Sequence, residues 1–225
     1  MIPWVQLDAA RTPDGAQELR LKRRGAEFSI KLGTQELMNS RLSATEQALA
    51  TIGCAKIKDR KQPHVLIGGL GMGFTLRAAL AVLGKQAEVT VAELVPAVVS
   101  WARGPMKKMS GDSLTDKRVH IHEGDVGELI RAGRSAYDAI LLDVDNGPEG
   151  MTRKANDRLY DLKGLRATYT ALRPRGVLAV WSSKPDAKFT ARLRKTGFDV
   201  VENPVRAKGP QGGAQHFIWT ATRPN

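Results

Sequence analysis

The ten residues VLIGGLGMGF (Val65–Phe74) decide the fold of this chain, because an apolar run stops abruptly there at a cluster of glycines. A helical pattern follows from Thr75 to Leu83. Together they predict a buried parallel strand, a tight turn and a helix that begins over the strand end. Gly69, Gly71 and Gly73 would expose backbone N–H groups to a ligand and permit positive φ in the turn. Glycine-rich turns also occur for steric reasons, so this pattern alone does not establish a ligand site.

Strand and helix patterns alternate after this turn, which is typical of a parallel sheet with helices on both faces. We expect further strands at 88–93, 118–123, 137–143 and 176–181, and helices at 96–108, from 126, at 159–172 and at 187–196. The chain closes with strands at 198–205 and 215–222, joined by a glycine-rich turn that favours a hairpin over a helical crossover. The sequence therefore predicts an α/β, Rossmann-like, seven-stranded and mostly parallel sheet with a C-terminal antiparallel hairpin.

A small β appendage is predicted before this sheet. Alternating runs at 4–7, 18–22 and 27–32 indicate three short strands, which are too few to be stable alone. Ser43 and Glu46 have the spacing of a capping box and predict a helix to about Ile52. We therefore divide the chain into residues 1–55, a small N-terminal region of strands and helix, and residues 56–225, the Rossmann-like catalytic domain.

Composition narrows the class of protein. The chain has 225 residues, 42% of them hydrophobic, and lacks the run of about 18 apolar residues that a membrane helix needs. The single cysteine, Cys54, excludes an internal disulfide framework and is typical of a reducing cytoplasm. The net charge of +12 raises the possibility of an anionic partner such as nucleic acid, although the basic residues are scattered, as on a solvated surface.

Acidic residues follow the predicted strands at the edge where open α/β sheets bind ligands. Glu93 ends the second strand about 20 residues after the glycine turn, where an acid accepts hydrogen bonds from ribose hydroxyls. Asp125 follows the third strand and can cap the next helix or hold an adenine amino group. Asp143 ends the fourth strand, where it can act as a general base or orient a substrate amine. Tyr160 either lines an acceptor pocket or packs in the core.

No metal site is predicted. His120 and His122 share one face of a strand, but no further His or Cys lies nearby in the sequence, and a pair of histidines is more often structural than metal-binding.

These motifs resemble the S-adenosylmethionine-fold transferases, and within them the spermidine synthase-like branch. The glycine turn through Arg77 is similar to the first motif of that family, the segment Glu93–Val99 to its ribose motif, and the segment Arg118–Asp125 to its adenine motif. The segment from Tyr137 to Asp143 resembles the catalytic region. The resemblance implies S-adenosylmethionine or its decarboxylated form as donor, bound by Gly69, Gly71, Gly73, Glu93, Asp125 and Asp143. It implies catalytic roles for Asp143, Asp145 and Tyr160, and a possible homodimer.

Several positions depart from the family pattern. The glycine turn lacks the family's aspartate, the Asp-x-x-Asp motif is shortened to Asp143-Val-Asp145-Asn146, and the helix after the N-terminal strands keeps only Glu46 of a Tyr-His-Glu group. We therefore expect methyl transfer to a small-molecule acceptor, with aminopropyl transfer from decarboxylated S-adenosylmethionine to a polyamine or other amine as the alternative. A nicotinamide-dependent dehydrogenase and a nucleic-acid-binding module are the remaining hypotheses.

Overall fold

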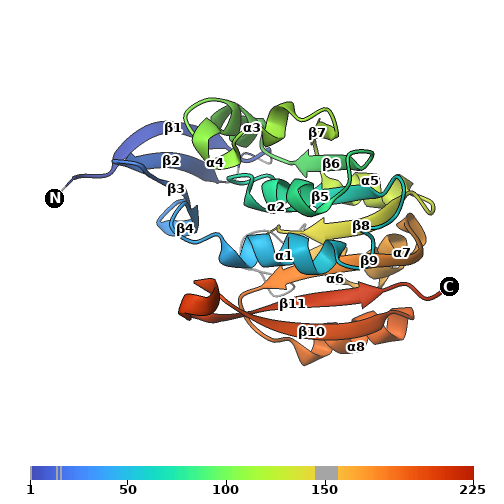
Figure 1. The fold of residues 1–225 in the computed structure, drawn as a ribbon. Helices are drawn as coiled ribbons and strands as arrows, with labels where there is room; N and C mark the ends of the chain where they lie inside the picture. Colours follow the sequence, from blue (N-terminus) through green and yellow to red (C-terminus); the bar gives the residue numbers. More distant parts are fainter. Residues whose placement is uncertain (1, 14, 16, 145–156) are drawn as a thin grey trace.

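The computed structural model describes residues 2–13, 15, 17–144 and 157–225. Its main sheet has seven strands in the order β10-β11-β9-β8-β5-β6-β7 (Figure 1). The five strands from β9 to β7 are parallel, while β11 pairs antiparallel with both β9 and β10. This confirms the predicted α/β sheet and its C-terminal hairpin.

The main sheet is built on two short, apolar central strands, β5 and β8, as is typical of buried parallel strands. Its seven strands are β5 (His64–Gly68), β6 (Glu88–Glu93), β7 (Val119–Glu123), β8 (Tyr137–Leu142), β9 (Leu172–Ser182), β10 (Asp199–Arg206) and β11 (Gln215–Thr222). The helices around it are α1 (Ala44–Cys54), α2 (Phe74–Val82), α3 (Pro96–Arg103), α4 (Lys107–Ser110), α5 (Val126–Ala132), α6 (Asp157–Tyr160), α7 (Leu162–Ala171) and α8 (Ala187–Thr196).

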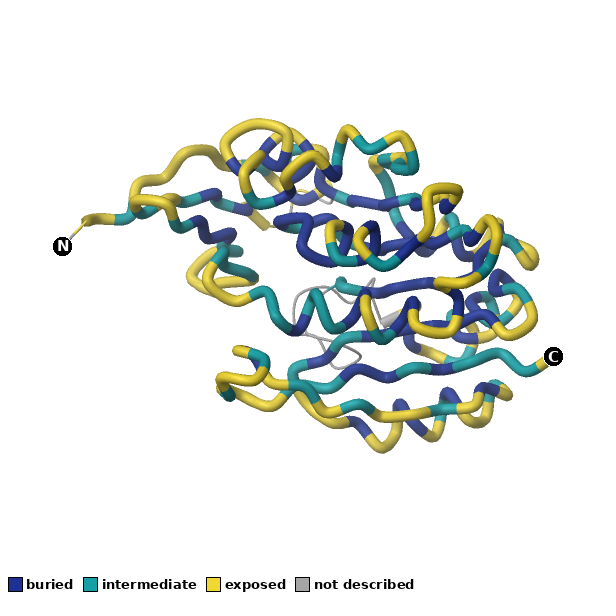
Figure 2. Tube along the Cα trace, in the orientation of Figure 1, coloured by how far each residue is buried: buried dark blue, intermediate teal, exposed yellow. Residues whose placement is uncertain are grey.

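Alternate residues of the central strands face two separate cores. In β5, Val65 and Ile67 face the core under α1, α2 and α3, whereas Leu66 faces the core under α5, α7 and α8. The sheet is therefore covered by helices on both faces, and its central strands are the most deeply buried part of the chain (Figure 2).

The N-terminal sheet has four strands rather than the three predicted: β1 (Val5–Arg11), β2 (Glu18–Arg24), β3 (Glu27–Leu32) and β4 (Gln35–Asn39). The sequence did not predict β4, because only two residues, Gly33 and Thr34, separate it from β3. Its residues are also exposed or half-buried, so they show no clear apolar pattern. Leu21 and Ile30 join the core of the main sheet, so this small sheet packs onto the larger unit. The division at residue 55 stays a prediction.

Three local predictions were wrong. The Ser43 side chain makes no capping bond to α1, and Glu46 instead accepts a bond from the Thr45 hydroxyl at 2.8 Å. The predicted helix 96–108 is broken into α3 and α4 at Gly104 and Pro105, because proline lacks the N–H that a continuous helix needs. The predicted helix 159–172 is also divided, since Asp161 caps a new helix by accepting from the Gly164 N–H at 2.7 Å.

Candidate functional site

A cavity of about 320 Å³ opens at the carboxyl ends of the parallel strands, between the main sheet and the N-terminal sheet. Strand order lays out its wall: Asp125 follows β7, Glu93 ends β6, Gly69 follows β5, Asp143 follows β8 and Trp181 lies near the end of β9. The N-terminal sheet, its connection to α1 and α1 itself close the other side with mostly apolar side chains, among them Leu19, Ile30, Leu32, Leu37 and Leu42. The cavity therefore lies where open α/β sheets bind ligands.

Glu93 is buried at this edge and holds the glycine turn in place. Its Oε2 accepts from the Leu70 N–H and its Oε1 from the Val95 N–H, both at 2.9 Å. Burial raises the pKa of Glu93, although these backbone N–H groups act in the opposite direction. The backbone N–H groups of four residues act on this carboxylate, which is about the number of hydrogen bonds that a carboxylate can accept. Glu93 therefore organises the turn, and its binding of ribose hydroxyls stays a prediction.

The turn requires glycine at three positions, because the backbone there has positive φ and because neighbouring atoms leave no room for a side chain. Gly69, Gly71 and Gly73 have φ values of 89°, 50° and 80°. A Cβ on Gly69 would lie 2.6 Å from the Asp143 carbonyl oxygen, and one on Gly71 would lie 2.5 Å from Met38 Cε. Gly69 and Gly71 line the cavity, whereas Gly73 begins α2 and packs against Ser110 outside the described lining.

Asp125 is half-buried and caps α5, which is one of the two roles predicted for it. Its Oδ1 accepts from the Gly127 N–H at 2.8 Å, and its Oδ2 lies 3.6 Å from Arg131 Nη2. The side chain also lines the cavity, which leaves adenine recognition compatible with its capping role.

Asp143 lies beside a second acid, Glu46, to which the sequence alone assigned no role in the site. Thr75 Oγ1 lies 2.9 Å from Asp143 Oδ2 and 3.4 Å from the Glu46 carbonyl oxygen. Burial and the neighbouring Glu46 carboxylate raise the pKa of Asp143 to about 7, and burial raises the pKa of Glu46 as well. A carboxyl group whose pKa is raised to near neutrality suits an acid–base function. The family resemblance of Ala44-Thr45-Glu46 was the sequence feature that pointed to Glu46.

The structure places Tyr160, another of the predicted catalytic residues, in the core. Tyr160 is buried, stacks edge-on against Phe189, and donates from its hydroxyl to the Val144 carbonyl at 3.3 Å. It therefore fixes the chain just after Asp143 and is not among the described lining residues. Asp145 lies outside the described residues.

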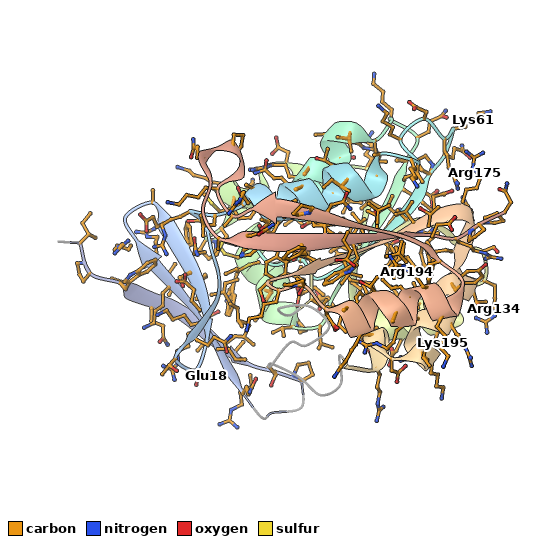
Figure 3. All side chains as sticks on the ribbon, turned by 90° about the horizontal axis from the view of Figure 1, so that it is seen from below. Glu18, Lys61, Arg134, Arg175, Arg194 and Lys195 are labelled. Atoms are coloured by element: carbon orange, nitrogen blue, oxygen red, sulfur yellow. The ribbon has the colours of Figure 1, made fainter. Side chains whose placement is uncertain are left out.

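The charge of the cavity is opposite to that of the whole chain. Its described lining carries four acids, Glu46, Glu93, Asp125 and Asp143, and no Lys or Arg. Basic side chains such as Lys61, Arg134 and Arg175 instead project outward at the end of the molecule away from the N-terminal sheet (Figure 3). The net charge of +12 is thus a property of the surface, and this cavity favours cationic ligands.

The described residues meet neither the requirements of a metal site nor those of a membrane-spanning helix. Within the described part of the chain, no three His, Cys, Asp or Glu side chains are grouped closely enough to hold a metal ion. None of the described helices has the length and apolar character needed to cross a bilayer.

The fold and this cavity define the class of protein: the chain has the class I S-adenosylmethionine-dependent transferase fold. A sequence profile of the Spermine/spermidine synthase domain matches residues 44–192. The chain belongs to the spermine/spermidine synthase family.

Relatives of known name agree with this placement. The chain is 33% identical over 127 residues to "Polyamine aminopropyltransferase 1" of Streptomyces coelicolor, covering 55% of this chain and 23% of that protein. It is 27% identical over 196 residues to "Polyamine aminopropyltransferase" of Mycobacterium tuberculosis, covering 82% of this chain and 36% of that protein. The chain thus spans well under half the length of these curated relatives.

Solved structures share the fold across nearly the whole chain. Spermidine synthase from Thermotoga maritima superposes with a TM-score of 0.75 at 18% identity, covering 97% of this chain and 72% of that one. A spermidine synthase solved in complex with the transition-state analogue AdoDATO superposes with a TM-score of 0.74, with the same identity and coverage.

Proposed function

We propose that this protein transfers an aminopropyl group from decarboxylated S-adenosylmethionine to a primary amine. The observation that carries the proposal is the charge of the cavity, which presents four carboxylates and, among its described residues, no basic side chain. Both reactants are cations, a sulfonium with a propylammonium arm and an amine. Desolvating such groups is costly unless carboxylates receive them.

The same charge pattern disfavours the intact donor. S-adenosylmethionine carries a carboxylate on the arm that its decarboxylated form lacks. The described wall offers that carboxylate no cationic partner, and Asp143 and Glu46 would repel it. Methyl transfer, the function that we expected from the sequence, requires this intact donor. The alternative of aminopropyl transfer has the better support, from the family, from the names of the relatives and from the cavity.

Each cavity residue then has a defined task. Gly69 and Gly71 let the backbone approach the donor, Glu93 receives its ribose hydroxyls and Asp125 its adenine. Asp143 and Glu46 hold the acceptor amine, and Asp143 takes its proton, since a base with a pKa near 7 is matched to neutral pH. The donor supplies a carbon activated by its sulfonium.

The reaction is a single in-line displacement. The amine lone pair forms a bond to the propyl carbon while the carbon–sulfur bond breaks and its electron pair returns to sulfur. The neutral thioether leaves without help from an acid, so catalysis consists of orientation, exclusion of water and removal of the amine proton.

Two measurements test this proposal. Calorimetric titration with both donor forms should show tighter binding of the decarboxylated form. Incubation with that donor and a series of primary amines should yield 5′-methylthioadenosine and an amine heavier by one aminopropyl group, detected by mass spectrometry. Formation of S-adenosylhomocysteine from intact S-adenosylmethionine, with no aminopropyl product from any amine, would overturn the proposal in favour of methyl transfer.

A further inference from the structure

The two carboxylate oxygens of Asp143 have different surroundings. Oδ2 accepts a hydrogen bond from the Thr75 hydroxyl at 2.9 Å, whereas no described residue donates to Oδ1. Among the described residues, the fully buried side-chain atoms without a hydrogen-bond partner are Trp181 Nε1 and His216 Nδ1. Asp143 Oδ1 is not one of them, so it is accessible to solvent, and Asp143 lines the cavity. This oxygen is therefore the one that a ligand can reach.

Thr75 lies behind this carboxylate. Its residue is 2% exposed and is not among the described lining residues of the cavity. The backbone of Asp143 is fixed as well, since its N–H donates to the Gly68 carbonyl at 3.0 Å and its carbonyl oxygen lies against Gly69. The side chain of an aspartate keeps a broad, roughly two-fold rotation about χ2. Among the described residues, the hydrogen bond from Thr75 is the one that restrains this rotation.

The Thr75 hydroxyl has one hydrogen to donate and two acceptors within reach. Asp143 Oδ2 lies 2.9 Å from Thr75 Oγ1, and the Glu46 carbonyl oxygen lies 3.4 Å from it. The shorter distance favours donation to Asp143, and so does its charge, because hydrogen bonds to an ionised acceptor are stronger than those to a neutral one. The hydroxyl lowers the pKa of Asp143, whereas burial and the Glu46 carboxylate raise it.

Few charged or titratable groups surround this carboxylate. Glu46 approaches it from α1, and Thr75, on α2, is uncharged. Glu93 and Asp125 line the same cavity from the ends of β6 and β7, and His216 lines it from β11. The described lining contains no Lys or Arg. The Thr75 hydroxyl is thus the described side-chain group that stabilises the ionised, proton-accepting form by direct contact.

We propose that Thr75 is a positioning residue, whose hydroxyl holds Oδ2 of Asp143 and so presents Oδ1 to the acceptor amine as the atom that takes its proton. This inference rests on the proposed aminopropyl transfer and assigns the proton to one oxygen. The acceptor ammonium gives a proton to Oδ1, and the freed lone pair bonds to the propyl carbon as the carbon–sulfur electron pair returns to sulfur. Oδ1 later releases the proton to solvent. Oδ2 accepts from Thr75 throughout.

Thr75→Val keeps the shape of the side chain and removes the hydroxyl. With decarboxylated S-adenosylmethionine and the primary amine that reacts fastest, the pH of half-maximal kcat/KM should rise by about one unit, because the ionised carboxylate has lost a donor. At high pH, kcat should fall about tenfold, because the carboxyl group is free to turn. Calorimetry should show unchanged donor affinity. Thr75→Ser restores the hydroxyl and should recover the pH profile and most of kcat.

Thr168→Val is the matched control. Thr168 is also a buried threonine on a helix, α7, and its Oγ1 donates to the Gly164 carbonyl at 3.0 Å outside the cavity lining. This variant should leave the pH profile of kcat/KM unchanged. An unshifted profile in Thr75→Val, or a Thr75→Ser profile that shifts as far as that of Thr75→Val, would overturn the inference while leaving aminopropyl transfer intact.

Urea unfolding tests the same contact without turnover. Thr75→Val should lose more stability near pH 8 than near pH 5, because at pH 5 the folded protein keeps Asp143 protonated with or without the hydroxyl. In an Asp143→Asn background this difference should vanish, as it should for Thr168→Val. If Thr75→Val does not fold, Thr75→Ala takes its place in every measurement.

The unfolding measurement also separates the two proposals. If no amine receives an aminopropyl group, the proposed function fails, and the pH dependence of stability still decides whether Thr75 acts on the charge of Asp143. An equal loss of stability at both pH values would overturn this role of Thr75, since a hydroxyl that only packs in the structure contributes the same amount whether Asp143 is charged or neutral.

Discussion

Replacing Asp143 with Asn should make the protein more stable and less active at the same time. The substitution keeps the shape of the side chain and an oxygen that accepts from Thr75, but removes the charge. The pKa of Asp143 is raised from its ordinary value of 3.8 to about 7, first by burial and then by Glu46. The folded protein therefore holds a proton on this group over a range of pH in which the unfolded chain has lost it.

The sign and size of the effect follow from this difference in pKa. An acid with a raised pKa in the folded state destabilises the protein progressively as pH rises from its unfolded value to its folded value. At about 1.4 kcal/mol for each pKa unit, the cost is about 4 kcal/mol near pH 8, about 2 kcal/mol near pH 5 and almost nothing below about pH 3.5. Asp143→Asn should raise the free energy of unfolding by up to these amounts.

Urea unfolding of both proteins near pH 8 and near pH 5 measures the difference. Asp161→Asn is the control, since Asp161 caps α7 in an exposed position outside the cavity lining and Asn caps helices equally well. Asp143→Asn should also reduce kcat for aminopropyl transfer at least about 100-fold while donor affinity stays nearly the same. A variant that is less stable near pH 8, or whose advantage is the same at both pH values, would refute the raised pKa and with it the role of Asp143 as a base poised near neutrality.

Three further outcomes are expected. Glu46→Gln removes the like charge that helps to raise the pKa of Asp143, so the rise of kcat/KM with pH should move below pH 7. An unchanged pH profile of kcat/KM would show that Glu46 does not affect the pKa of Asp143. Glu93→Ala removes the acceptor of the Leu70 and Val95 N–H groups and should weaken donor binding at least about tenfold by calorimetry; undiminished affinity would exclude Glu93 from the donor site. Gly69→Ala would force a Cβ to 2.6 Å from the Asp143 carbonyl oxygen at a φ of 89°, and it should lower the free energy of unfolding by about 1–3 kcal/mol. Urea unfolding measures this loss, with Gly84→Ala as the control because Gly84 has open space around it. An equal loss in both variants would count against the close packing of the turn.

Local sequence patterns were sufficient for the main sheet and its ligand-binding edge. The apolar run before Gly69 and the alternating strand and helix patterns predicted the parallel strands, and the bounds of β6, α8 and β11 agree with those expected. They succeeded because a strand buried on both faces must be continuously apolar. Errors occurred where a single residue changed the local backbone, as at Pro105 and Asp161.

The net charge of the whole chain did not predict the charge of its cavity. The charge of +12 raised the possibility of an anionic partner, yet the described cavity wall is acidic. A sum over the sequence cannot separate side chains that face outward, such as Lys61 and Arg175, from those that face a ligand. For Tyr160 the sequence left open a place in the acceptor pocket or in the core, and the structure buries the side chain against Phe189.

The sequence by itself determined the class of fold, the glycine turn and the acids at the strand ends, because each is encoded within a few consecutive residues. Only the tertiary structure decided that Glu46 lies beside Asp143 and that Trp181 meets His216. These pairs come from distant segments, the first brought together by the packing of α1 near the end of β8 and the second by the antiparallel pairing of β11 with β9. Spacing along the chain carries no information about such contacts, because the folding of the whole sheet creates them.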